Sequence, residues 1–273
     1  MSAAFAPHLH TVPVVTSAAV RRSPLVPGGM PAAVAAALWR GDQLGGSVST
    51  VWSSGFAVLD AELPGGGWPG RGLTEILCPH SGTLEWRLLG PLLRKLCTAR
   101  RSVVVVGPPH PPHLPGLRFE GIAESHLVWV QAATASERLW SAEQLVKANA
   151  CGALIVWLPQ VRAAQVRRLQ VLAAGCEGPV FLCREASAGM ESSAAPLRVQ
   201  ARVGADWALH VDIVKRKGPP LMQTLRLPSV PGGLMSVLTP RLRTPGALLV
   251  PQRSDDVVVS AAAAPPRRHS LIH

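Results

Sequence analysis

The residues from Cys78 to Leu84 have the order expected of a turn that binds phosphate. They follow a short β-type run, Leu73–Leu77, and precede a helical segment, so the predicted order is strand, turn and helix. A working phosphate loop needs glycine for close backbone approach, lysine for the outer phosphates and a hydroxyl for magnesium. Gly82 is present, but Thr83 and Leu84 occupy the lysine and hydroxyl positions, and the loop is one residue short. We therefore expect a degenerate phosphate loop without a bound cofactor, formed by Pro79, Ser81, Gly82 and Thr83.

Two further requirements of an ATPase are also missing. Such an enzyme needs a carboxylate after a neighbouring strand to position water, and an Asp after another strand to hold magnesium. The strand Ser102–Val106 is followed by GPPHPPH, which contains no carboxylate. In the segment Leu154–Gln160, Trp157 and Leu158 stand where the magnesium-binding Asp would be. Since phosphoryl transfer depends on these charges, we predict a protein that is not an enzyme and has no catalytic residue.

Other chemistries have weaker support. His110 and His113 have a spacing that a metal site could use, but their loop holds no Cys or carboxylate and its prolines favour an extended shape, so we expect a rim loop and no metal. The motif G-x-S-x-G of serine hydrolases is absent. The five cysteines are dispersed, without a C-x-x-C pair, which indicates buried free thiols in a reducing cytoplasm.

Alternating apolar strands and helices surround these segments. Because several of these strands are apolar on both faces, we expect an α/β fold with a mostly parallel sheet covered by helices on both faces. Pro91 lies inside the first predicted helix and should kink it or divide it into two pieces. The predicted strands are Leu73–Leu77, Ser102–Val106, Leu127–Gln131, Ala153–Leu158 and Val180–Cys183, and the predicted helices are Thr83–Ala99, Ser136–Asn149 and Val161–Ala174.

The pattern changes after Arg184. Leu197–Val203 and Trp207–Val214 alternate polar and apolar residues around a Gly-Ala-Asp turn, which predicts an antiparallel hairpin with one face toward water. Leu221–Leu227 is a candidate third strand.

The chain of 273 residues is long enough for one α/β domain with tails. We expect a disordered N-terminal tail at 1–30, a domain at 31–227 that opens with a short helix, Pro31–Trp39, and a basic, Pro-rich flexible tail at 228–273. The sequence shows neither a secretory signal nor an apolar run long enough to span a membrane, so we expect a cytoplasmic protein.

Positive charge is concentrated toward the C-terminus. The net charge is +11, and residues 198–253 carry nine basic and two acidic side chains. This excess favours a polyanion or an acidic protein surface as partner, with simple solubility as the alternative. Arg162, Arg167 and Arg168 spread over a helix face and indicate a solvated surface. The candidate partner or DNA contacts are Lys215, Arg216, Lys217, Arg226, Arg241 and Arg243.

Several motifs together carry a family resemblance. SSGFAVLD (53–60), GGGWPGRGLTEI (65–76) and the Pro-x-Ser-Gly turn resemble the opening of the RecA core, and the hairpin that ends in VDIVKRKG (211–218) resembles the strands that close it. With LWRGDQLG (38–45), the degenerate loop and the basic tail, the chain resembles the ImuA family of accessory proteins in bacterial damage-induced mutagenesis. The resemblance covers roughly residues 36–227.

The resemblance implies a RecA-like fold, often without a competent nucleotide site. It implies a role in the SOS response and translesion DNA synthesis, with an ImuB-like protein that resembles a polymerase without catalytic residues. An alternative C-family DNA polymerase would be reached through that protein, and RecA is a further partner to test. No clear match to the DNA-binding loops of RecA stands at 159–163 or 185–195, so direct DNA contact is left open.

Two alternatives remain from other classes. A residual RecA-like ATPase would bind a fluorescent ATP analogue in a manner that depends on Gly82. A SulA-like inhibitor of cell division would bind FtsZ and make cells filament when overexpressed, although this chain is longer and has the extra basic tail.

Overall fold

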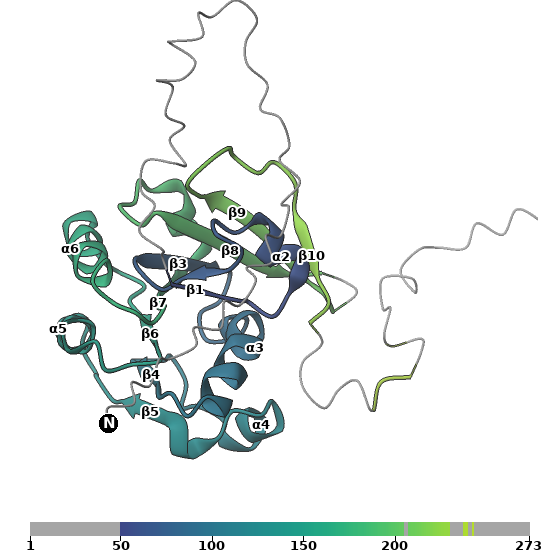
Figure 1. Cartoon of the computed structure of the whole chain (residues 1–273), viewed down its shortest axis with the longest axis horizontal. Coiled ribbons are helices and arrows are strands. Elements are labelled where there is room, and N and C mark those ends of the chain that lie inside the picture. Colours follow the sequence, from purple (N-terminus) through teal and green to yellow (C-terminus); the bar gives the residue numbers. More distant parts are fainter. Residues whose placement is uncertain (1–49, 205–206, 230–236, 240–241, 243–273) are drawn as a thin grey trace, which may run out of the picture. The chain divides into compact units, whose positions relative to one another are not determined.

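The computed structural model describes residues 50–204, 207–229, 237–239 and 242. The predicted tail 1–30, the predicted helix Pro31–Trp39, the segment LWRGDQLG and most of the predicted tail 228–273 lie outside these residues. An eight-stranded sheet organises the described part, in the order β10-β9-β8-β3-β7-β6-β4-β5 (Figure 1). Its strands are β3 (Leu73–Cys78), β4 (Val103–Val106), β5 (Leu127–Val130), β6 (Ala153–Trp157), β7 (Val180–Glu185), β8 (Leu197–Val203), β9 (Leu209–Lys215) and β10 (Leu225–Leu227).

The sheet is parallel from β5 to β8, and only its last strands reverse direction. β9 runs antiparallel to β8, and β10 runs antiparallel to β9. Every residue of β3, β4 and β6 is buried, as expected of strands covered on both faces. The predicted α/β class, the mostly parallel sheet and the C-terminal antiparallel hairpin are therefore confirmed.

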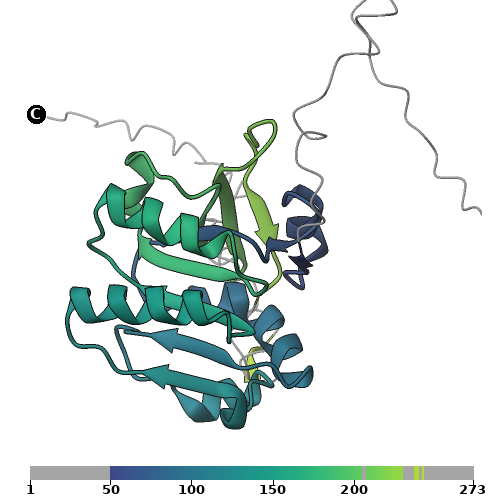
Figure 2. The same cartoon turned by 60° about the vertical axis from the view of Figure 1, so that its left-hand side comes forward.

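Helices cover both faces of the sheet and create two cores. The helices α2 (Ala57–Glu62), α3 (Glu85–Thr98) and α4 (Leu114–Phe119) contribute to one core. The other core contains α5 (Ala135–Ala148) and α6 (Ala163–Ala173), which lie side by side (Figure 2). The short strands β1 (Val51–Trp52) and β2 (Trp68–Pro69) pair separately, and two 3-10 turns, η1 (Glu124–His126) and η2 (Ala186–Met190), complete the described elements.

Helix α3 continues through Pro91 as one helix instead of two pieces. A proline inside a helix costs about 3 kcal/mol because it removes a hydrogen bond and crowds the preceding turn. The burial of an apolar stripe against the sheet opposes that cost. This stripe consists of Leu88, Leu89, Leu92, Leu93 and Leu96.

Several local features differ from the expectation, and two of them lie near residues discussed below. Helix α4 was not predicted, because a Pro-rich loop precedes it and Leu114–Phe119 is too short to show a helical period. The hairpin face predicted to meet water includes Arg198, but its side chain is buried. Within the described ranges, no helix has the length and apolar character needed to cross a membrane.

Candidate functional site

The turn between β3 and α3 has the predicted strand–turn–helix course. Its residues Pro79 and Thr83 are exposed, and Ser81 and Gly82 are half-buried. Gly82 has a φ of +88°, in the left-handed region that favours glycine. The Thr83 hydroxyl donates a hydrogen bond to the carbonyl of His80 over 2.9 Å. The structure thus brings the predicted loop residues together, with this hydroxyl used by the turn itself.

A carboxylate of the chain occupies the anion-binding side of this turn. The backbone N–H of Gly82 donates to both Glu85 carboxylate oxygens, at 2.9 and 3.0 Å. Glu85 is the first residue of α3 and is only 1% exposed. Helix N-termini attract anions because their backbone N–H groups are free and the helix dipole is positive there. Glu85 supplies such an anion internally, at the end of the helix where a phosphate would otherwise bind.

A side chain of β6, which is separated from β3 by β7 in the sheet, also binds Glu85. The indole N–H of Trp157 donates to Glu85 over 3.0 Å in a buried hydrogen bond. The Trp157 ring also packs against Trp86 of α3, with 5.8 Å between ring centroids. A magnesium-dependent site would need an Asp at the end of this strand. Trp157 stands in its place, and its contacts with Glu85 and Trp86 connect β6 to the start of α3.

The loop after β4 covers the outside of the turn. A Cβ atom built on Gly82 would lie 2.5 Å from Cγ of Pro109 and 3.7 Å from the His110 ring. In a phosphate loop, glycine lets the backbone approach the ligand closely. Here the close approach is made by a proline of the chain, so Gly82 serves internal packing.

The thiols around the turn are poor nucleophiles. Burial raises the pKa of Cys78 and Cys183 far above the ordinary value, and the nearby Glu85 carboxylate raises both further. Burial also raises the pKa of Cys151 to about 11. All five cysteines are free, as predicted. Because the thiolate is the reactive form, these groups are protonated and unreactive near neutral pH.

The histidines of the HPPH loop have a structural use. His113 is the N-cap of α4, and its Nδ1 atom accepts a hydrogen bond from the Gly116 N–H over 3.2 Å. His110 is exposed beside the turn. Among the described residues, no group of three or more His, Cys, Asp or Glu side chains could hold a metal ion.

Comparison with known proteins provides no family assignment. No protein-family model matches the chain. No curated protein matches it either.

The predicted basic contacts that the structure describes do not form one patch. Lys215 donates to the carbonyl of Ser193 over 2.7 Å, and Arg216 binds the Glu62 carboxylate over 2.9 Å and is 14% exposed. Lys217 is exposed in the turn after β9.

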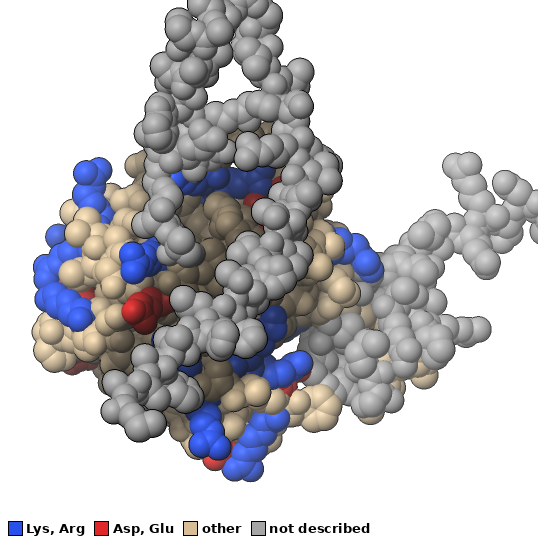
Figure 3. All heavy atoms as spheres, in the orientation of Figure 1, with Lys and Arg blue, Asp and Glu red and all other residues tan. Residues whose placement is uncertain are grey.

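Arg226 lies on β10 opposite His210 of β9. His210 and Lys215 are five positions apart on that strand, so Arg226 lies about 17 Å along it from Lys215. The Lys and Arg side chains visible in Figure 3 accordingly form several separate groups. Arg241 and Arg243 lie outside the described residues.

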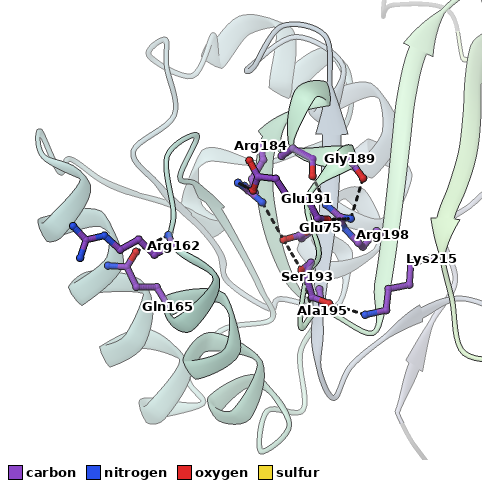
Figure 4. Close-up of polar contacts among 11 residues, drawn as sticks. Glu75, Arg162, Gln165, Arg184, Gly189, Glu191, Ser193, Ala195, Arg198 and Lys215 are labelled. Atoms are coloured by element: carbon purple, nitrogen blue, oxygen red, sulfur yellow. Dashed lines mark hydrogen bonds and ion pairs between the residues drawn. The ribbon is translucent and has the colours of Figure 1, made fainter.

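A buried ion cluster surrounds Glu75 of β3 and was not predicted. Glu75 is fully buried and forms ion pairs with Arg198 of β8 and, over 3.6 Å, with Arg184 of β7. Ser193 donates to Glu75 over 2.9 Å. Arg198 also donates to the carbonyls of Ala188, Gly189 and Glu191. Figure 4 shows these side chains converging on one loop, with Arg162 and Gln165 of the α6 region apart from them.

The sequence partly indicated the roles of Glu85 and Glu75, which were not predicted. Glu85 stands three positions after the turn glycine, at the start of a helix, where an acidic side chain commonly accepts backbone hydrogen bonds. Glu75 is the one charged residue of a central, mostly apolar strand, and a charge there requires a buried partner. The identity of those partners depends on strand order, which no local pattern determines.

Proposed function

We propose that the protein is a non-catalytic, RecA-like accessory protein of SOS-induced translesion DNA synthesis. It acts as a scaffold with an ImuB-like protein and, through that protein, with an alternative C-family DNA polymerase. The geometry of the turn between β3 and α3 supports the non-catalytic part, and the motif resemblance supports the pathway.

The hydrogen bonds of the Glu85 carboxylate are the observation that best supports a non-catalytic role. It accepts both hydrogen bonds from the Gly82 N–H and a third from Trp157. A nucleotide phosphate in this turn would meet a buried negative charge in place of a lysine. Pro109 lies over the same glycine. The turn therefore stabilises the fold, and function is assigned to the surrounding surfaces.

The order of the strands is consistent with a RecA-like core. The resemblance leads us to expect a parallel sheet that begins with the loop strand and is closed by antiparallel strands. The sheet has β3 near its middle, and β8, β9 and β10 extend it to one edge. This layout supports the RecA-like part of the proposal.

Capture of partners from cells treated with a DNA-damaging agent tests the proposal. We expect the tagged full-length chain to recover an ImuB-like protein and the alternative polymerase, with or without nuclease. Recovery of FtsZ in their place would favour a SulA-like inhibitor. Partners that disappear after nuclease treatment would instead indicate association through DNA.

A shortened chain tests where the ImuB-like protein binds. A chain that ends at Ser229 keeps the contact between Arg87 and the Ser229 carbonyl, so the described domain should remain intact. We expect this chain to lose the ImuB-like protein. Unchanged recovery would show that binding does not need residues 230–273.

A further inference from the structure

A groove of about 670 Å³ lies beside the turn, on the side of α3 that faces α4. Its floor and walls come from α3, α4, the HPPH loop and the segment that follows β10. Aromatic and apolar side chains dominate it, among them Phe56, Trp86, Leu117, Phe119 and Ile122. Phe119 is 69% exposed and lies together with the other apolar side chains of the groove, so the groove presents a contiguous apolar surface.

The charged groups of this groove already have partners in the chain. Arg94 donates to the Glu120 carboxylate over 3.1 Å. Arg87 donates to the carbonyls of Trp207 and Ser229. With its cations engaged, the groove recognises an occupant mainly through apolar contact.

The C-terminal part of the chain begins at the wall of this groove, and Leu242 is linked to the groove through Trp207. Pro228 and Ser229 line it directly. Further along, the indole N–H of Trp207 donates to the carbonyl of Leu242 over 2.7 Å, and the carbonyl of that same Trp207 accepts from Arg87. Two hydrogen bonds in series therefore connect Leu242 to a side chain of the groove.

We propose that the segment 247–250 of the same chain, Ala-Leu-Leu-Val, occupies this groove. It is the first apolar run after Leu242, and six residue steps to Leu248 span at most about 21 Å. So short a connection gives the segment a high effective concentration at the groove, which favours binding within one chain. Leu248 and Leu249 cover Phe119 and Trp86. This inference does not depend on the proposed function.

Hydroxyl-radical footprinting of the full-length chain measures the exposure of these side chains directly. In the variant L248S/L249S, we expect oxidation of Phe119 and Trp86 to rise several-fold relative to the unaltered chain. The variant V257S/V258S is the matched control, because it alters another apolar run of the same region and should leave both rates unchanged. Trp140 on α5 is the internal reference, since it is 64% exposed and does not line the groove.

A cross-link provides the second measurement. Under mild oxidation, F119C/L248C should form a disulfide within one chain, at a yield independent of protein concentration. W140C/L248C should form no such disulfide, although Trp140, like Phe119, is exposed on a helix. Equal oxidation of Phe119 in all the footprinting variants would overturn the proposal. A cross-link that joins two chains would also overturn it, because it would indicate a second copy as the occupant.

Discussion

Two buried glutamates near β3 show two ways in which this fold uses negative charge. Glu85 is held by neutral donors, the Gly82 N–H and the Trp157 indole. Glu75 is held by two guanidinium groups, those of Arg184 and Arg198. The Glu85 carboxylate therefore accepts hydrogen bonds from the turn and from β6, whereas Glu75 neutralises buried cations, of which Arg198 also binds carbonyls of the η2 loop.

The Glu75 cluster should be the more sensitive of the two. The substitution Glu75→Gln leaves the buried Arg198 guanidinium without its carboxylate, and leaves Arg184 with only the more exposed Glu191. Breaking a buried ion pair in this way costs about 3–5 kcal/mol of unfolding free energy. Urea denaturation measures the loss. Glu191→Gln is the matched control, because it removes only the solvent-exposed carboxylate bound to Arg184 and should cost much less. Equal losses would contradict the central role of Glu75.

The turn should respond more weakly to loss of its carboxylate. Glu85→Ala leaves the Trp157 and Gly82 donors without their acceptor, which costs about 1–3 kcal/mol for a buried group. Glu85→Gln retains one carbonyl oxygen and should cost less. Thermal and urea unfolding of both variants give the ranking. If Glu85→Ala were as stable as the unaltered chain, the carboxylate would not be holding the turn.

Gly82 and Gly66 form a matched pair that isolates the contact with Pro109. Both have a φ of +88°, so alanine is strained at either position by about 1 kcal/mol. Only at Gly82 would the new Cβ meet another residue, whereas nothing lies within 4 Å at Gly66. Gly82→Ala should therefore lower the unfolding free energy more than Gly66→Ala. Equal losses would mean that Pro109 moves aside easily.

The smallest expected effect is on the pH dependence of stability. Hydrogen bonding and charge from Arg184 lower the pKa of Glu191 from its ordinary value of 4.5. A carboxyl with a lowered folded-state pKa contributes stability above its unfolded pKa and loses it as the pH falls through the folded value. Between pH 6 and pH 3, the stability of Glu191→Gln should decline less than that of the unaltered chain. Parallel pH profiles would show that this pair contributes nothing.

The sequence predicted the sheet well because its central strands are apolar on both faces. Val103–Val106 and Ala153–Trp157 appear where continuous burial was expected. Helix α4 was missed because His113 starts it through a side-chain cap after two prolines, without a long apolar period. Arg198 looked solvent-facing because alternation along a strand does not reveal that the η2 loop covers its end of the sheet.

The turn was only partly predictable for a similar reason. The missing lysine and hydroxyl were visible at Thr83 and Leu84, because these are local positions. The contact of Glu85 with Trp157 joins residues 72 positions apart through the packing of α3 on β6. Local spacing therefore led us to expect a degenerate phosphate loop, but it could not identify Glu85 as the acceptor of the hydrogen bonds from Gly82 and Trp157.

Titration with a fluorescent ATP analogue tests the central claim most directly. We expect no saturable binding to the full-length chain at micromolar concentrations, with or without magnesium, because Glu85 accepts the Gly82 N–H and Pro109 lies close to the same glycine. Thr83→Lys, which restores the missing cation alone, should not create binding. Micromolar binding by the unaltered chain that disappears in Gly82→Ala would contradict the account and identify a working nucleotide site.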